Sequence, residues 1–345
     1  MQNAAAIQRG VRERRAEALA RRRRTVRHAT DIYRTVDHGN APEICFREQF
    51  VWLPRERPAP VGLDGDDDGA ALRSRTDRLT RDWSSRPPAT RLLKRRNNGM
   101  SLYLTAIYVA HQTAEPTTAV PNARANTKRH DGLDPWAALA GLGLGSDQRA
   151  RRAQVTRALD QLHLARLVDL RRGTRGVQYE GFALLQDDGS LSRYILPSPD
   201  EATVVKLPAT FFYNGWHLVL EPDEIAMLLA IRHATVLAQR QGIATEHGVA
   251  IPRALRWSRY GISSETYTAV NELQEFGLIR IIELMPNRRH GRLRRVGQGD
   301  DDPDQSFAPI LYRFVIDEAA FDQDAWEIIH RALTKFKEPP RLSHG

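Results

Sequence analysis

The chain of 345 residues has one cysteine and five lysines among its 51 basic residues. The single cysteine, Cys45, excludes an internal disulfide and any zinc site built on cysteine ligands. The longest apolar run, residues 225–231, is too short to span a bilayer. The Arg-rich N-terminus lacks the apolar segment of a secretory signal. The sequence therefore predicts a soluble, cytoplasmic protein with no membrane partner.

Motifs for common catalytic chemistry are also missing. The sequence contains no Walker-type phosphate loop, no H-E-x-x-H, no H-x-H and no G-x-S-x-G. The run "DGDDDG" (64–69) begins like an EF-hand loop, but Arg75 stands where that loop needs glutamate. The run "GLGLG" (141–145) follows a predicted helix rather than a strand, which favours a turn over a nucleotide-binding loop. We expect a protein that is not an enzyme and that uses no cofactor or metal.

What the chain does have is positive charge, with a net charge of +9 and a pI near 10.0. Such a charge favours a polyanionic partner, nucleic acid above all. Residues 8–28 carry nine arginines and two glutamates and could form a helix, although one without a clean apolar stripe. We predict that residues 1–95 form a basic, partly disordered N-terminal extension. Its arginines would act as a flexible arm on DNA, with a solvated tail as the alternative. The apolar island 44–54 is expected to dock on a later domain.

A repeated pattern of elements occupies the rest of the chain. Shifting the sequence by 111 residues superimposes apolar positions without a gap: Leu159 on Val270, Leu162 on Leu273, Leu167 on Leu278 and Val168 on Ile279. Each copy has a long apolar helix upstream (101–111 and 223–238) and then a short second helix. A Gly/Ser turn, a third helix, a strand, an Arg-rich loop and a second strand follow. We call residues 99–185 the first unit and residues 221–317 the second unit.

This order of elements resembles the winged-helix variant of the helix-turn-helix: helix, helix, turn, helix, strand, loop and strand. The tandem layout is similar to that of transcription regulators and theta-type plasmid replication initiators. The resemblance implies an α+β, mainly helical fold with two tandem winged-helix domains at 96–190 and 203–318. A C-terminal helix or tail would occupy 319–345. It also implies that the third helix enters the DNA major groove and that the loop, or wing, reaches phosphates.

In the first unit the predicted recognition helix covers residues 146–164. Val155, Leu159 and Leu162 form its buried stripe. The residues expected to contact DNA from its outward side are Arg149, Arg152, Gln154, Thr156 and Arg157. The wing at 171–176 would add Arg171, Arg172 and Arg175. The alternative is an ordinary solvated face in an Arg-rich chain.

The second unit differs in charge. Its third helix (263–276) carries Glu265, Glu272 and Glu275 outward and no base, so we expect it either to face protein or to leave DNA contact to the wing at 288–295. That wing holds the cations Arg288, Arg289, Arg292, Arg294 and Arg295. The segment 207–224 is predicted to be a small hairpin under this unit, with a hinge or dimer patch as the alternative.

The sequence thus favours a nucleoid-associated protein that binds double-stranded DNA sequence-specifically, most simply a transcriptional regulator. A replication initiator of a plasmid or mobile element is the first alternative. The second is an interaction scaffold whose second unit binds a protein partner. A homodimer is compatible with the small surface that a single module buries, although two modules in one chain make it unnecessary.

Overall fold

The structure is a computed structural model that describes residues 2–36, 41–55, 86–93, 98–114, 119–143, 147–170, 179–199, 204–282 and 312–335. It is an α+β protein, mainly helical, with small antiparallel sheets, as the sequence predicts at this level. Strands β1 (Glu43–Arg47) and β4 (Val204–Pro208) pair with each other. Apolar side chains from both units and from the N-terminal segments share one continuous core.

The first unit begins with α4 (Gly99–Thr113), which is buried on nearly all sides. The short α5 (Trp136–Leu139) and the long α6 (Gln148–Leu164) pack on it. Strands β2 (Val168–Asp169) and β3 (Ala183–Leu184) close the unit as an antiparallel pair. The order of elements is therefore the one that the sequence predicts for this unit.

The second unit begins with α9 (Pro222–Arg240) and continues through α10 (Arg253–Ser258). Its third helix is divided at Thr268 into α11 (Ser264–Tyr267) and α12 (Ala269–Glu275). A three-stranded antiparallel sheet has the order β5-β7-β6, and its strands are β5 (Val249–Ala250), β6 (Ile279–Ile282) and β7 (Arg313–Ile316).

The third helices of the two units end in the same way, 111 residues apart. The backbone N–H of Leu167 donates to the carbonyl of Leu162 over 2.9 Å, and that of Leu278 donates to the carbonyl of Leu273 over 2.9 Å. The residue before each donor has a left-handed backbone, with φ 64° at Arg166 and 77° at Gly277. Both ends therefore have the hydrogen bonding of a Schellman cap, which turns the chain out of the helix and into a strand.

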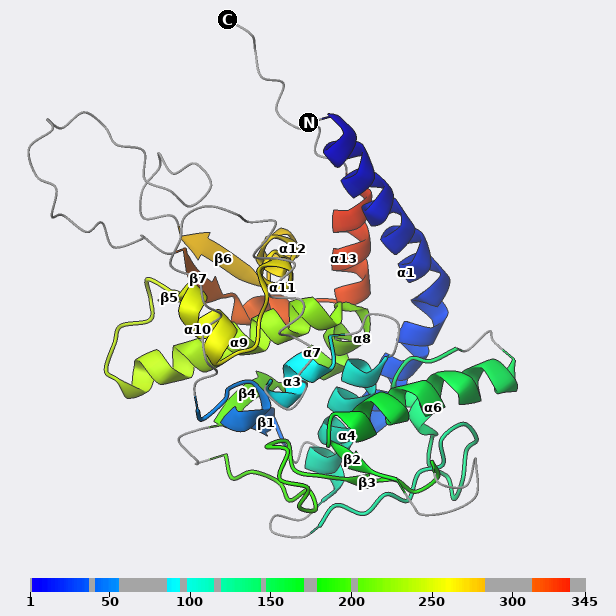
Figure 1. Cartoon of the computed structure of the whole chain (residues 1–345). Coiled ribbons are helices and arrows are strands. Elements are labelled where there is room, and N and C mark those ends of the chain that lie inside the picture. Colours follow the sequence, from blue (N-terminus) through cyan, green and yellow to red (C-terminus); the bar gives the residue numbers. More distant parts are fainter. Residues whose placement is uncertain are drawn as a thin grey trace, which may run out of the picture.

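The prediction of a flexible N-terminal arm is wrong for residues 2–36, which form the long helix α1 (Gln2–Val36). Alanine and arginine are strong helix formers, which favours this state locally. Leu19, Val26, Ala29 and Tyr33 are buried, and α1 lies along α13 (Ala325–Thr334), as Figure 1 shows. The 35-residue helix spans about 52 Å. It is therefore long enough to contact both units.

Arginines supply part of the inward face of α1, which is why its sequence shows no clean apolar stripe. The guanidinium of Arg15 binds the carboxylate of Glu224, and that of Arg22 donates to the carbonyl of Leu218 over 3.1 Å. Long basic side chains can pack their aliphatic stems against a core while their head groups reach polar partners. Tyr33, near the other end of α1, hydrogen-bonds to the first unit through the carbonyl of Leu139 at 2.6 Å.

The apolar island of the N-terminal region docks as the sequence predicts. Strand β1 pairs with β4, and η1 (Glu48–Phe50) follows it. Arg47 binds the fully buried Asp187 beyond the first unit, through its backbone N–H at 2.6 Å and its guanidinium at 2.8 Å. Trp52 packs edge-on against Tyr260 of the second unit, with ring centroids 4.8 Å apart. This segment therefore links the two units a second time.

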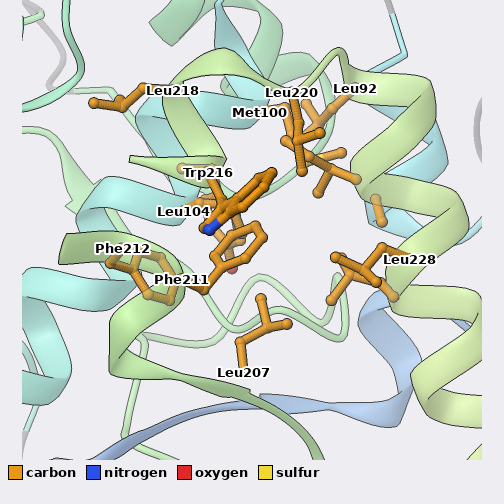
Figure 2. Packing of buried hydrophobic residues seen from close by; sticks show 14 of the residues in the cluster. Leu92, Met100, Leu104, Leu207, Phe211, Phe212, Trp216, Leu218, Leu220 and Leu228 are labelled. Atoms are coloured by element: carbon orange, nitrogen blue, oxygen red, sulfur yellow. The ribbon is translucent and has the colours of Figure 1, made fainter. Parts of the chain in front are cut away.

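The prediction of a hairpin at 207–224 is wrong. After β4 the chain forms two short helices, α7 (Ala209–Tyr213) and α8 (Trp216–Val219). Gly215 adopts a left-handed conformation between them, with φ 79°. Phe211, Phe212 and Trp216 are fully buried, and Figure 2 shows them gathered with leucines of neighbouring elements. The aromatic residues of this segment therefore build the central core between the two units, instead of a surface hairpin.

The remaining elements complete this core. The short helix α3 (Pro88–Arg91) lies near α9 and η1. The turn η3 (Glu318–Asp322) places the fully buried Phe321 against Phe211, with ring centroids 5.6 Å apart. It leads directly into α13, so residues 318–334 are integrated with the core and include the helix predicted for the C-terminal segment.

Candidate nucleic-acid interface

Helix α6 is held in place by an N-cap and a buried stripe. The carboxylate of Asp147 accepts a hydrogen bond from the backbone N–H of Arg149 over 3.2 Å, which satisfies one of the free donors of the first turn. Val155, Leu159 and Leu162 are buried, as the 3.6-residue period predicts. Arg149 and Arg157 lie away from this stripe, whereas Arg152 is seven residues before Leu159 and lies on the stripe's side of the helix, near its N-terminus.

Three arginines of α6 reach solvent. Arg149, Arg152 and Arg157 are all exposed. The Nε of Arg157 donates to the carbonyl of Ala153 over 3.2 Å, which keeps this side chain along the helix. Within the described ranges, none of the three lies within ion-pair distance of a carboxylate. Their charges are therefore open to an outside anion.

Thr156 lies on the same side of α6 as Arg149, and Gln154 lies nearer to Arg157. Thr156 is half-buried and lies two turns after Arg149. Gln154 is also half-buried, and a rotation of 100° per residue places it about 140° from Arg149 but only about 60° from Arg157. The polar side chains predicted to contact DNA therefore spread over a wide arc of α6, since Arg152 and Arg157 are themselves about 140° apart around the helix.

The arginines of both predicted wings lie outside the described residues. This applies to Arg171, Arg172 and Arg175 of the first unit, and to Arg288, Arg289, Arg292, Arg294 and Arg295 of the second. The strands that flank these loops are described, and in each unit they pair antiparallel, Val168 with Leu184 and Ile279 with Ile316. Each Arg-rich loop therefore connects two paired strands that follow the third helix.

The acidic third helix of the second unit has a protein contact within the chain. The guanidinium of Arg12 on α1 binds both carboxylate oxygens of Glu275, at 2.5 and 2.6 Å, and donates to the carbonyl of Ala332 over 2.9 Å. The hydrogen bond to Glu275 raises the pKa of Arg12. The other end of this helix remains open, since Ser264, Glu265, Thr268 and Asn271 are exposed. The C-terminal end of this helix therefore binds α1 of the same chain, and the expectation that the helix faces a protein partner stays a prediction.

One polar contact at α6 was not predicted from the sequence. The hydroxyl of Tyr179 donates to a carboxylate oxygen of Asp160 over 2.8 Å. Asp160 lies on the same side of α6 as Arg149, three turns further along. The signal was present in the helical spacing, but the Tyr179 partner is 19 residues away and only the fold brings it to the helix.

The cavity between β4, α9 and β7 offers little to a charged ligand. Its volume is about 480 Å³, and its lining includes Lys206, Arg232 and Phe314. Both cations already have acid partners, since Lys206 lies 2.9 Å from Glu43 and Arg232 lies 2.5 Å from Glu318. The exposed arginines of α6 are therefore better placed to bind an anion than the cations of this cavity.

Over the part of the chain that the structure describes, no cluster of three or more histidine, cysteine, aspartate or glutamate side chains could hold a metal ion. The same residues include no helix that is both long and apolar enough to cross a membrane.

No family model, curated protein or solved structure matches this chain.

Proposed function

We propose that this protein binds double-stranded DNA sequence-specifically, with α6 as the recognition helix of the first unit. The observation that carries the proposal is the set of exposed cations Arg149, Arg152 and Arg157 on a helix that an N-cap and a buried apolar stripe hold in place. Arginine pairs bidentately with guanine edges and with phosphates, and a helix of this width fits the major groove.

The contrast with α1 supports this choice of surface. Several arginines of α1 have partners inside the protein: Arg12 and Arg15 bind glutamates, and Arg23 and Arg27 lie 2.9 and 3.4 Å from Glu327. Total charge therefore overstates what is available to an outside polyanion. The exposed arginines of α6 do not form such ion pairs within the described residues, so they are better able to contact a phosphate or a base.

The arrangement of the second unit supports a winged-helix interpretation. Its sheet order β5-β7-β6 follows helices α9, α10 and α11–α12, and the third helix ends with the same cap as α6. Because Glu275 is bound to Arg12, the acidic end of α12 already has a partner in the same chain. This accounts for one of the three acids, Glu265, Glu272 and Glu275, on which the interaction-scaffold alternative rests. The proposal covers a transcription regulator and a replication initiator alike, since both bind duplex.

The test is a selection of bound duplexes from a random library, followed by titration of the selected duplex and a scrambled duplex at two salt concentrations. We expect one enriched motif. Arg149→Ala with Arg157→Ala should then weaken binding to it by about 1–3 kcal/mol for each arginine that pairs with a base. The matched control is Arg14→Ala with Arg24→Ala, which removes the same charge from exposed positions on α1.

The control should leave the ratio of affinities for selected and scrambled duplex unchanged. If the α6 variant keeps that ratio too, α6 is not the recognition helix. If no motif is enriched and binding disappears at the higher salt, the protein has only non-specific electrostatic affinity.

A further inference from the structure

The solvent face of α6 changes sign along its length. Arg149, Arg152 and Arg157 lie in its first three turns, and Asp160 follows in the next one. Asp160 is eleven residues after Arg149, which places the two about 20° apart around the helix and about 16 Å apart along it. Within the described ranges, Asp160 forms no ion pair, so its charge is not neutralised by a neighbouring arginine.

Tyr179 holds this carboxylate in position. Its hydroxyl donates to Asp160 over 2.8 Å, and its backbone carbonyl accepts from the side-chain amide of Asn126 over 2.8 Å. The carboxylate of the next residue, Glu180, accepts from the backbone N–H of Asn126 over 3.0 Å. The tyrosine is thus anchored on both sides, and the half-buried Asp160 is kept at the helix surface, where it is not free to turn away from an approaching phosphate.

We propose that Asp160, positioned by Tyr179, is a specificity-determining residue that limits DNA contact to the first three turns of α6. This inference rests on the proposed function. Non-specific binding depends on phosphate contacts. The fixed carboxylate of Asp160 repels phosphates. It therefore disfavours any position of the helix along the duplex (its register) that brings phosphates to the fourth turn. In the register fixed by base contacts, Arg149 and Arg152 meet the duplex and Asp160 lies outside it. Asp160 therefore lowers the affinity for the wrong duplex more than the affinity for the right one.

The experiment uses the full chain and two duplexes, the selected one and a scrambled one, at low salt. Asp160→Asn removes the charge but keeps an oxygen that accepts from Tyr179. We expect this variant to bind the scrambled duplex about fivefold more tightly, the effect of one unit charge at close range in water. Its affinity for the selected duplex should change by less than about twofold, since that register keeps the side chain away from phosphates.

Two further variants make the test specific. Asp169→Asn removes the same charge from an exposed position on β2 of the same unit, so it controls for net charge. We expect it to leave the affinity ratio of the two duplexes unchanged. Tyr179→Phe keeps the charge and removes the hydrogen bond. It should raise the affinity for scrambled duplex in the same direction as Asp160→Asn but by less, because the freed carboxylate can turn away.

The outcomes separate the two proposals. If the wild-type protein binds no duplex, the proposed function fails. If it binds but Asp160→Asn behaves like Asp169→Asn, only the role of Asp160 is refuted. If Asp160→Asn weakens binding to the selected duplex, the carboxylate accepts a hydrogen bond from a base, which also overturns the limiting role. An unchanged Tyr179→Phe variant would overturn the role given to the tyrosine.

Discussion

Replacing Arg15 by alanine should destabilise the protein strongly, because it leaves a buried carboxylate without its cation. Arg15 binds both oxygens of Glu224, at 2.5 and 2.8 Å, and only 3% of the Glu224 side chain is exposed. Removing one partner of a buried ion pair costs about 3–5 kcal/mol. Glu224 also accepts from the backbone N–H of Glu221 over 2.7 Å, so it cannot leave its site without uncapping α9.

The pH dependence of this loss has a definite sign. Burial raises the pKa of Glu224, and the charge of Arg15 counteracts that effect. Without Arg15 the pKa rises further. The folded variant then binds a proton at a pH where the unfolded chain, with an ordinary glutamate pKa, does not. Protonation of Glu224 therefore offsets part of the variant's deficit relative to wild type as the pH falls toward the ordinary glutamate pKa. The difference between variant and wild type, measured at each pH, should become smaller on acidification.

The assay is urea unfolding followed by far-UV circular dichroism, with Arg14→Ala as the matched control. Arg14 is the preceding residue on the same helix and is exposed, so its loss should stay within about 0.5 kcal/mol. Combining Arg15→Ala with Glu224→Gln removes the buried charge and should restore much of the lost stability. The reasoning is refuted if Arg15→Ala and Arg14→Ala unfold at the same urea concentration, or if Glu224→Gln makes the defect larger.

Three other perturbations have clear expectations. Tyr33→Phe removes the hydroxyl that lies 2.6 Å from the carbonyl of Leu139 and 2.9 Å from Nε2 of His217. It should lower the free energy of unfolding in urea by about 1–3 kcal/mol. A loss below about 0.5 kcal/mol would contradict this. The Cβ added by Gly277→Ala would contact no neighbouring atom, but the residue would have to keep a φ of 77°. This strain should lower the free energy of unfolding by about 1–2 kcal/mol. An unchanged unfolding midpoint would show that the cap tolerates a side chain. Burial lowers the pKa of three histidines, to about 3 for His217 and about 4 for His111 and His233. The unfolded chain takes up these protons near pH 6.5, so the free energy of unfolding should decrease as the pH falls from 6.5 toward 4. The expected loss is about 2 kcal/mol per histidine at pH 5. Urea midpoints that match at pH 7 and pH 5 would refute this.

The parts of the fold that local periodicity dictates could be predicted from the sequence. The third helix of the first unit was expected at 146–164 and is found at Gln148–Leu164, with its apolar stripe buried. The 111-residue shift also matched positions that are buried in both units, such as Leu162 and Leu273. Such features are predictable because a helix of this length presents its core residues at a fixed spacing.

Features that depend on distant partners could not be predicted. The inward arginines of α1 resemble a solvated basic tail until Glu224 and Glu275, more than 200 residues away, are placed beside them. The aromatic residues at 211–216 suggested a hairpin because the turn at Asn214-Gly215 also suits one. In the structure that glycine separates two helical turns. The role of Asp160 was missed for the same reason, since its partner is set by the fold.

The pairing of α1 with α13 has a consequence for the synthesis of this protein. The indole N–H of Trp326 donates to the carbonyl of Leu19 over 2.9 Å, across 307 positions of sequence. At about 5–20 residues per second, a ribosome needs about 15–60 s to travel that distance. During that interval the buried face of α1 has no α13 to cover it. In the nascent chain, the part of α1 that packs on α13 therefore stays uncovered until translation passes Thr334. A chaperone that binds Arg-rich, partly apolar helices could bind this surface during that interval.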